Sequence, residues 1–223
     1  MVDRYEGAFT YSRLNDYDQC RLLFKLRHIE KRKEPDSPHF VKGNRIHEGI
    51  DMYLKKRANG IPLEAKPLAK ELSALRNDKT LRGEEAWGFD DSWEPLPVTG
   101  YFSKRDHIRA KIDALRSIKD TAIVIDFKSG QVRDASEDQV RFYGVLTLLR
   151  ELKFKIGKLQ LWFVEHGQIK EYEPVLRKDV AALKKGYADR FKKIQMTSVF
   201  EPTPGVYCRW CPFSKHKGGP CKF

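Results

Sequence analysis

The stretch "TAIVIDFKSGQ" (Thr121–Gln131) predicts a buried β-strand that ends at two charged side chains. Its first half is apolar and largely β-branched, which is typical of a short strand covered on both faces. Because residues i and i+2 of a strand share a face, we expect Asp126 and Lys128 to point together, with Phe127 opposite. Gly130 then ends the strand. A carboxylate and an ammonium brought to one place form either a structural ion pair or part of a functional site.

Length and composition indicate a globular protein. A chain of 223 residues is long enough for one domain with a substantial core. With 40% hydrophobic and 33% charged residues it is not of the disordered class. No apolar run approaches the ~20 residues of a membrane span, and the N-terminal sequence has no apolar signal core. We therefore expect a soluble, cytoplasmic protein without a membrane partner.

The chain is strongly basic. Lys and Arg number 43 against 31 Asp and Glu, for a net charge of +12. This excess favours a polyanionic partner, most simply nucleic acid, although a basic surface without a partner is a reasonable alternative. The basic residues cluster in Lys25–Lys33 and Leu183–Lys193, which have the pattern of charged faces on folded elements.

The hydrophobic pattern predicts a mixed α/β domain. Helices are expected over residues 12–29 with Ser12 as N-cap, 42–58, 68–76, 136–152 with Ser136 as N-cap, and 178–196. Strands are expected over residues 98–104, 108–116, 122–128, 158–165 and 168–174, with a tight turn at His166–Gly167 between the last two. The tail that follows the last helix is expected to be irregular.

A second carboxylate is expected beside the first. In "HIRAKIDALRS" Asp113 lies on the face opposite the alternating apolar residues, so it could meet Asp126 and Lys128 across the sheet. Two converging carboxylates repel each other unless a cation lies between them, and Mg²⁺ is the usual one. Lys128 could then orient or deprotonate an attacking water. For one Asp-x-Lys alone, an ion pair or a satisfied core network is the simpler interpretation.

The series "KID", "VIDFKSG" and "QVRFY" resembles the motifs of the PD-(D/E)XK nuclease superfamily, in particular its RecB-like branch. That branch has a histidine on an early helix, an aspartate before a (D/E)xK strand, and a Gln-x-x-x-Tyr motif on the next helix. Some members, notably the λ-exonuclease-like ones, add a glutamate. The matching positions, in chain order, are His47, Glu85 (with Glu84 close behind), Asp113, Asp126-Phe127-Lys128, Gln139 and Tyr143.

Each motif also has a simpler explanation. A lone helical histidine such as His47 is more often a hydrogen-bonded core residue than a ligand. Gln139 and Tyr143 share a helix face, which any amphipathic helix provides. A glutamate such as Glu85 is more often only solvated. The family order within one chain is what favours the nuclease interpretation.

The resemblance implies a restriction-endonuclease-like core, a central mixed sheet flanked by helices. It implies one RecB-like domain over residues 1–223, with a helical part to about 93, a catalytic sheet core over about 94–175, and a C-terminal helix and metal-binding tail. Mg²⁺ or Mn²⁺ would be held by His47, Asp113, Asp126 and the Phe127 carbonyl, with Glu85 as a further ligand. Asp113, Asp126, Lys128, Gln139 and Tyr143 would be the catalytic set.

The implied function is a metal-dependent deoxyribonuclease. We expect an exonuclease on single-stranded or end-bearing DNA, in recombination, repair or CRISPR-type processing within a bacterial, archaeal or phage-infected cell. Protein partners or a homo-oligomer would fit such a complex. A non-catalytic, cluster-bearing or zinc-stabilised DNA-binding subunit is the alternative, and a zinc-stabilised RNA-binding module is a third hypothesis.

Four cysteines provide an independent indication: Cys20, Cys208, Cys211 and Cys221. A lone Cys-x-x-Cys could be a redox pair, half a zinc site or chance, and structural disulfides are the less common use inside cells. A four-thiolate site for zinc or an iron–sulfur cluster uses every cysteine. Several RecB-like nucleases, including AddB-type and CRISPR-adaptation nucleases, hold a 4Fe-4S cluster with one N-terminal and three C-terminal cysteines. The resemblance thus implies a 4Fe-4S cluster, with zinc as the alternative, that staples the tail to the N-terminal helix.

Overall fold

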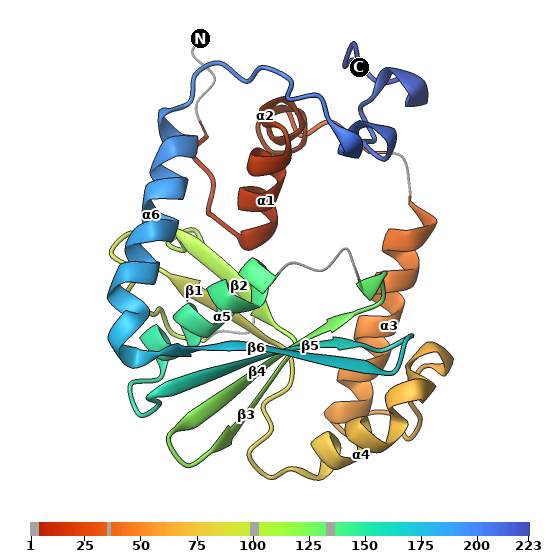
Figure 1. The fold of residues 1–223 in the computed structure, drawn as a ribbon, viewed down its shortest axis with the longest axis vertical. Helices are drawn as coiled ribbons and strands as arrows, with labels where there is room; N and C mark the ends of the chain where they lie inside the picture. The colour runs from red at the N-terminus through yellow and green to blue at the C-terminus, as the bar shows by residue number, and fades with distance from the viewer. Residues whose placement is uncertain (1–4, 35–36, 99–102, 133–136) are drawn as a thin grey trace. The chain divides into compact units, whose positions relative to one another are not determined.

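The computed structural model describes residues 5–34, 37–98, 103–132 and 137–223. The chain forms two compact units, one of Met1–Asp36 with Lys185–Phe223 and one of Ser37–Lys184 (Figure 1). We call them the terminal unit and the sheet unit. The single domain with three parts that the sequence suggested stays a prediction. Within the described residues, no helix combines the length and apolarity that a membrane crossing requires.

The sheet unit is built on two sheets. Four strands run in the order β3 (Ala114–Ile118), β4 (Thr121–Lys128), β5 (Ile156–Phe163) and β6 (Gln168–Leu176). The β4–β5 pair is parallel and the other two pairs are antiparallel. The second sheet pairs β1 (Glu85–Phe89) with β2 (Ile108–Ile112). This mixed sheet with flanking helices fits the predicted restriction-endonuclease-like fold.

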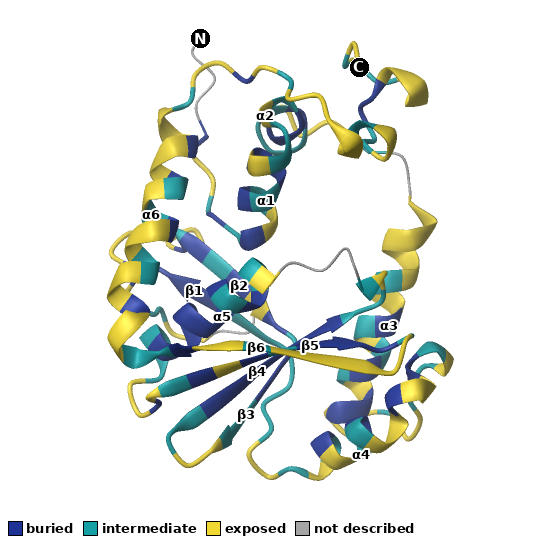
Figure 2. Ribbon diagram, in the orientation of Figure 1, coloured by how far each residue is buried: buried dark blue, intermediate teal, exposed yellow. Residues whose placement is uncertain are grey.

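Helices cover both faces of the four-stranded sheet. Helices α3 (Pro38–Leu54) and α4 (Ala69–Asn77) pack on one face, where their apolar residues form a core with Ile123, Ile125 and Phe127. Helix α5 (Glu137–Arg150) lies on the other, visible above the strands in Figure 1. A Cβ at Gly144 would lie 2.6 Å from Leu159 Cδ2, so a larger residue there would force the buried Leu159 side chain to shift. Figure 2 shows β4 and β5 largely buried and β6 largely exposed.

Two local predictions in this unit were wrong. The expected strand over residues 108–116 is split into β2 and β3, with Asp113 outside both. The Asp113 carboxylate accepts a hydrogen bond from a backbone N–H, an interaction that competes with a regular ladder. Strand β1 was missed because its acidic neighbours hide the alternation of Trp87 and Phe89, both fully buried.

Other expected elements are confirmed to within a few residues. Helices α3, α4 and α5 and the β5–β6 hairpin lie where the sequence indicated them, and Gly167 takes φ +63° in the turn. The long C-terminal helix is α6 (Val180–Met196), preceded by a short 3₁₀ turn. The predicted strand over 98–104 and the predicted cap Ser136 lie largely or wholly outside the described residues.

The terminal unit begins with a broken helix. Helix α1 (Tyr11–Gln19) starts at Thr10, whose hydroxyl accepts the Arg13 N–H at 3.2 Å, so the prediction of Ser12 as the cap was wrong. The extended backbone of Cys20 (φ −163°, ψ 119°) separates α1 from α2 (Arg21–Phe24). A π-helical turn follows, Lys25–Ile29, a feature often found near functional sites.

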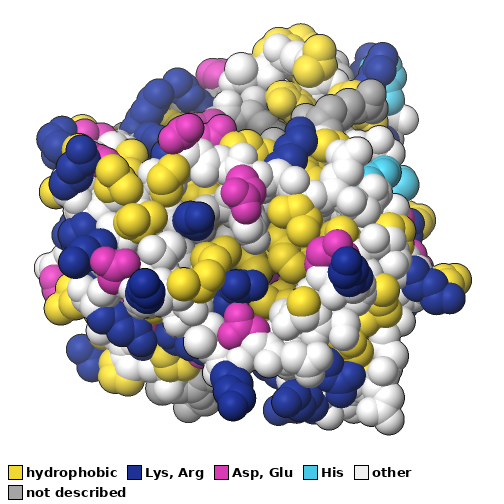
Figure 3. Space-filling view, turned by 60° about the horizontal axis from the view of Figure 1, so that its bottom comes forward, with side chains coloured by type: hydrophobic (Ala, Val, Ile, Leu, Met, Phe, Trp, Pro, Cys, Tyr) yellow, Lys and Arg dark blue, Asp and Glu magenta, His cyan; other side chains and the backbone are white. Residues whose placement is uncertain are grey.

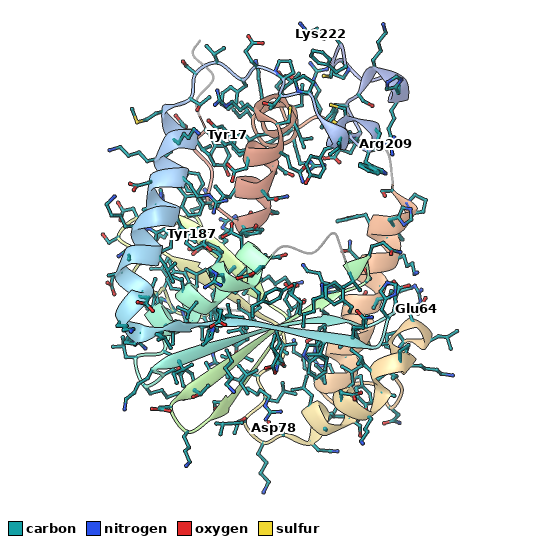
Figure 4. The ribbon with its side chains drawn as sticks, in the orientation of Figure 1. Tyr17, Glu64, Asp78, Tyr187, Arg209 and Lys222 are labelled. Carbon is teal, nitrogen blue, oxygen red and sulfur yellow. The ribbon has the colours of Figure 1, made fainter. Side chains whose placement is uncertain are left out.

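Aromatic contacts join the two chain segments of the terminal unit. Phe9 stacks on Phe191 of α6 with ring centroids 4.3 Å apart. The hydroxyl of Tyr17, labelled in Figure 4, lies 2.6 Å from Thr197 Oγ1. The two ends of the chain thus share one core.

Candidate active site

The end of β4 places charged side chains on one face of the sheet, as the alternation predicted. Lys128 Nζ lies 2.7 Å from Asp126 Oδ2. The Phe127 ring points the other way and packs edge-to-face on Trp162, with centroids 5.9 Å apart. Asp126 is only 4% exposed, so its charge lies at the edge of the core.

Asp113 joins this site from the break between β2 and β3. In the antiparallel register Ala114 faces Ile125, which sets Asp113 beside the end of β4. Asp113 Oδ2 accepts a hydrogen bond from Phe127 N at 2.8 Å and lies 3.4 Å from His47 Nδ1. The structure therefore brings His47, Asp113 and β4 together, as the motif order suggested.

Gly43 has a positioning role that sequence reasoning missed. It lies one helical turn before His47 on α3, and a Cβ added there would lie 3.1 Å from Ser129 Oγ. A glycine at this position lets α3 approach the end of β4, which carries His47 toward Asp113. An isolated glycine inside an amphipathic helix pattern was the signal that could have found it.

Burial and charge shift two pKa values here. Burial, reinforced by the charge of Asp113, raises the pKa of Asp126 to about 6, against the opposing charges of Lys128 and His47. Burial disfavours protonated His47, but hydrogen bonding and charge from Asp113, with the charge of Asp126, outweigh it and raise the His47 pKa. The site therefore favours bound positive charge.

A hydrogen-bonded chain leads from Lys128 to α5. Lys128 Nζ donates to Gln139 Oε1 at 2.6 Å, and Gln139 Nε2 donates to the Tyr143 hydroxyl at 3.1 Å. The Gln-x-x-x-Tyr pair thus contacts the Asp-x-Lys pair. Its direct effect in this structure is to orient the ammonium group.

The chemistry of the site fits a divalent cation. Asp126 Oδ2 is buried, and the cation beside it is the Lys128 ammonium at 2.7 Å, which also donates to Gln139. Such an oxygen beside a second carboxylate and an imidazole is a suitable ligand for Mg²⁺ or Mn²⁺. In the described part of the chain, however, no three His, Cys, Asp or Glu side chains are arranged to hold a metal.

Glu85 is hydrogen-bonded to residues outside this site. Its Oε2 accepts hydrogen bonds from Arg82 Nη2 at 2.6 Å and Trp87 Nε1 at 2.7 Å. Burial opposes ionisation of Glu85, but these bonds and the nearby guanidinium charges keep its pKa below the ordinary value. Glu84, the neighbouring candidate, pairs with Lys111 Nζ at 2.6 Å. A role for Glu85 as a metal ligand stays a prediction that requires these bonds to be exchanged.

The cysteines gather in the terminal unit, around a cavity of about 230 Å³ that we call the cysteine pocket. Its walls include all four: Cys20, Cys208, Cys211 and Cys221. Burial raises the pKa of the Cys211 thiol, and the three neighbouring thiols raise it further, against a backbone hydrogen bond from Phe213. All four cysteines are free of disulfides.

Backbone amides in the cysteine pocket point at sulfur. Thr203 N donates to Cys20 Sγ and Gly205 N to Cys208 Sγ, each at 3.4 Å. Amide donors to thiolate sulfur are a feature of metal–sulfur sites, where they tune the bound group. These two sulfurs thus accept backbone hydrogen bonds, although no three of the four thiols, all within the described residues, are arranged to hold a metal.

The basic residues are dispersed. On the face in Figure 3, Lys and Arg side chains spread across the surface with acidic side chains between them. Several are paired, such as Lys42 with Glu165 at 2.5 Å.

Comparison with known proteins gives a family. The model of the PD-(D/E)XK nuclease superfamily matches residues 8–216. No curated protein matches the chain. Among solved structures, the chain is similar to one described as "Crystal structure of SSO0001", with 16% identity and a TM-score of 0.46 over 98% of this chain and 88% of that chain.

Proposed function

The chain belongs to the PD-(D/E)XK nuclease superfamily, and on this premise we propose that it is a Mg²⁺- or Mn²⁺-dependent deoxyribonuclease acting at the end of β4. One observation carries the proposal: Asp113 and the buried Asp126 converge beside Lys128, and His47 lies 3.4 Å from Asp113. From this grouping we infer a hydrolytic metal site with an adjacent cation.

The residues have distinct roles. His47, Asp113, Asp126 and the Phe127 carbonyl would hold the metal, with Glu85 as a further ligand. When bound, the ion supplies Lewis-acid polarisation of the phosphodiester and of the attacking water. Lys128 orients that water and offsets the negative charge that develops on phosphorus-bound oxygens. Gln139 and Tyr143 hold the ammonium in place and contact DNA near the scissile phosphate.

The substrate follows from the surface. We propose an exonuclease acting on single-stranded or end-bearing DNA in the cytoplasm, within recombination, repair or CRISPR-type processing and in complex with protein partners or further copies of the chain. Dispersed Lys and Arg side chains hold the phosphate backbone without reading sequence. Affinity should then fall steeply as salt rises.

The cysteine pocket is part of this proposal. We propose that Cys20, Cys208, Cys211 and Cys221 hold a 4Fe-4S cluster, with zinc as the alternative, of the kind found in the RecB-like branch. The four side chains line one cavity, and two already accept amide hydrogen bonds. Such a group staples the N-terminal helix to the tail.

The test is cleavage of end-labelled DNA, single-stranded and duplex, with and without Mn²⁺. We expect Mn²⁺-dependent shortening of the strand, and none with Asp113→Ala or Asp126→Ala, which should also lose Mn²⁺ affinity in calorimetric titration. Binding without cleavage under every metal condition would favour the non-catalytic subunit instead.

A further inference from the structure

The C-terminal segment Pro202–Phe223 carries large aromatic side chains in solvent. Trp210 is 61% exposed and Tyr207 is 58% exposed. The other three tryptophans are buried, with 0–6% exposure: Trp87, Trp93 and Trp162. Since burying an aromatic ring is strongly favourable, an exposed Trp beside an exposed Tyr indicates a binding surface.

The backbone presents these two rings together. Val206–Arg209 form a 3₁₀ turn, and Trp210 N donates to Tyr207 O at 3.1 Å. In 3₁₀ geometry residues i and i+3 are eclipsed, so the two rings leave the turn on the same side. Their spacing along the axis is about 6 Å, since each residue rises about 2 Å. A planar base can therefore stack against this pair.

The charge around the rings is of one sign. From Pro202 to Phe223 the chain has no Asp or Glu, and its basic side chains are Arg209, Lys215, Lys217 and Lys222. The Arg209 guanidinium carbon lies 5.2 Å from the centre of the Trp210 ring, and Lys217 Nζ donates to Trp210 O at 2.9 Å. Arg209 and Lys222 are labelled on this segment in Figure 4. Two basic side chains thus lie beside Trp210.

We propose that this surface is a binding platform for single-stranded DNA, in which bases stack on Tyr207 and Trp210 and Arg209 and Lys217 neutralise phosphates. Aromatic rings interleaved with basic side chains are the means by which proteins bind single strands without sequence preference. A duplex keeps its bases paired and stacked on each other, so it offers only its phosphates. The platform concerns binding alone and belongs to the terminal unit, so it would hold even if the chain hydrolysed nothing.

Intrinsic fluorescence tests the platform directly. Trp210 is the exposed tryptophan, so stacking of a base on it should quench emission while the three buried tryptophans change little. We would titrate the full-length Lys128→Ala protein, without added divalent metal, with oligothymidylate of about 15 nucleotides, a length within the usual range of single-strand sites. Anisotropy of a labelled oligonucleotide gives the affinity independently.

We expect Trp210→Ala to weaken binding about 5- to 100-fold, the effect of losing one stacked base, and Trp210→Phe to restore most of it. Val206→Ala is the matched control, because Val206 is 74% exposed on the same turn and cannot stack. Arg209→Ala should lower the slope of log affinity against log salt by about 1. Equal melting temperatures would show that the variants are folded.

Wild-type affinity in Trp210→Ala, or preference for duplex over oligothymidylate, would overturn the platform and leave the surface to a protein partner. Loss of binding that Trp210→Phe does not restore would also overturn it. Neither result would affect the nuclease proposal, whose test is Mn²⁺-dependent cleavage.

Discussion

In the active site, Asp113 accepts a hydrogen bond from Phe127 N at 2.8 Å, and Lys128 donates one to Gln139 Oε1 at 2.6 Å. In the cysteine pocket, by contrast, the four cysteines surround a cavity of about 230 Å³. The active site lies on a sheet whose register fixes its residues. The cysteine pocket lies in largely irregular backbone, with Leu23, Leu26 and Phe213 as its buried apolar cluster.

The difference indicates how each site would depend on the metal group proposed for it. Removing a metal from the active site leaves a folded sheet with two repelling carboxylates and a lysine. Removing a group held by the four cysteines would leave a cavity supported mainly by irregular backbone and a small apolar cluster, so we expect binding and folding to be coupled there. Substitutions in the active site should therefore lower the cleavage rate, and substitutions in the cysteine pocket should lower the melting temperature.

The largest effect is expected for Lys128→Ala. Cleavage should fall by on the order of 10²–10³-fold, because the ammonium acts mainly on charge that develops in the transition state. The melting temperature should change little, since Lys128 is partly exposed at the end of a strand. Single-turnover cleavage and calorimetry measure the two quantities. A variant that cuts at the wild-type rate would show that Lys128 is structural.

The next effect is expected for Cys20→Ser, in stability. A metal group that joins Cys20 to the tail closes nearly the whole chain into a loop, and losing such a cross-link costs on the order of 4 kcal/mol. The melting temperature should fall and the tail should become sensitive to proteases. Cys208→Ser should behave alike, and Val206→Ala is the control on the same turn.

The identity of the group is measurable in the same preparations. Anaerobically purified wild-type protein should be brown, with broad absorbance near ~400 nm, if the group is an iron–sulfur cluster. Stoichiometric zinc in a colourless protein would show that the four cysteines hold zinc instead of an iron–sulfur cluster. The metal would still link the N-terminal helix to the tail. Four thiols that alkylate freely in the folded protein would contradict both.

A smaller stability effect of opposite sign is expected for Asp126→Asn in metal-free protein. Because the folded-state pKa is raised to about 6 from 3.8, the native state binds more protons than the unfolded state between those values. Native stability therefore decreases as pH rises through this window, by about 3 kcal/mol. Asp126→Asn should remove that loss above pH ~6 and melt higher than wild type, while cleavage disappears. A wild-type curve that stays flat from acid to neutral pH would contradict the burial of this charge.

The smallest effect is expected for Gly43→Val, about tenfold in cleavage, because a misplacement of His47 by a fraction of an ångström weakens the site. A side chain at this position would push against Ser129. Gly186→Ala is the matched control, since a Cβ there meets nothing within 4 Å. If both variants cut equally well, the approach of α3 to β4 has no catalytic role.

Much of the fold could be predicted because its elements are long and periodic. Helices α3 and α6 and strands β4 and β5 have clear patterns of burial, so their types and approximate bounds follow from local chemistry. Strand β1 and the break at Asp113 could not be predicted. Both depend on the partner strand: β1 is a strand because it pairs with β2, and Asp113 leaves the ladder because a backbone N–H of β4 is there to bond it.

For the site, the sequence by itself determined which residue types occur in which order, and the alternation of β4 determined that Asp126 and Lys128 share a face. Only the tertiary structure decided which side chains these residues bond to. Packing places Gln139 beside Lys128, and it places His47 beside Asp113 where α3 approaches β4 at Gly43. It also pairs Glu85 with Arg82 and Trp87. The reason is physical: periodicity is a property of neighbouring residues, whereas hydrogen-bond partners and burial depend on segments far apart in the chain that only packing brings together.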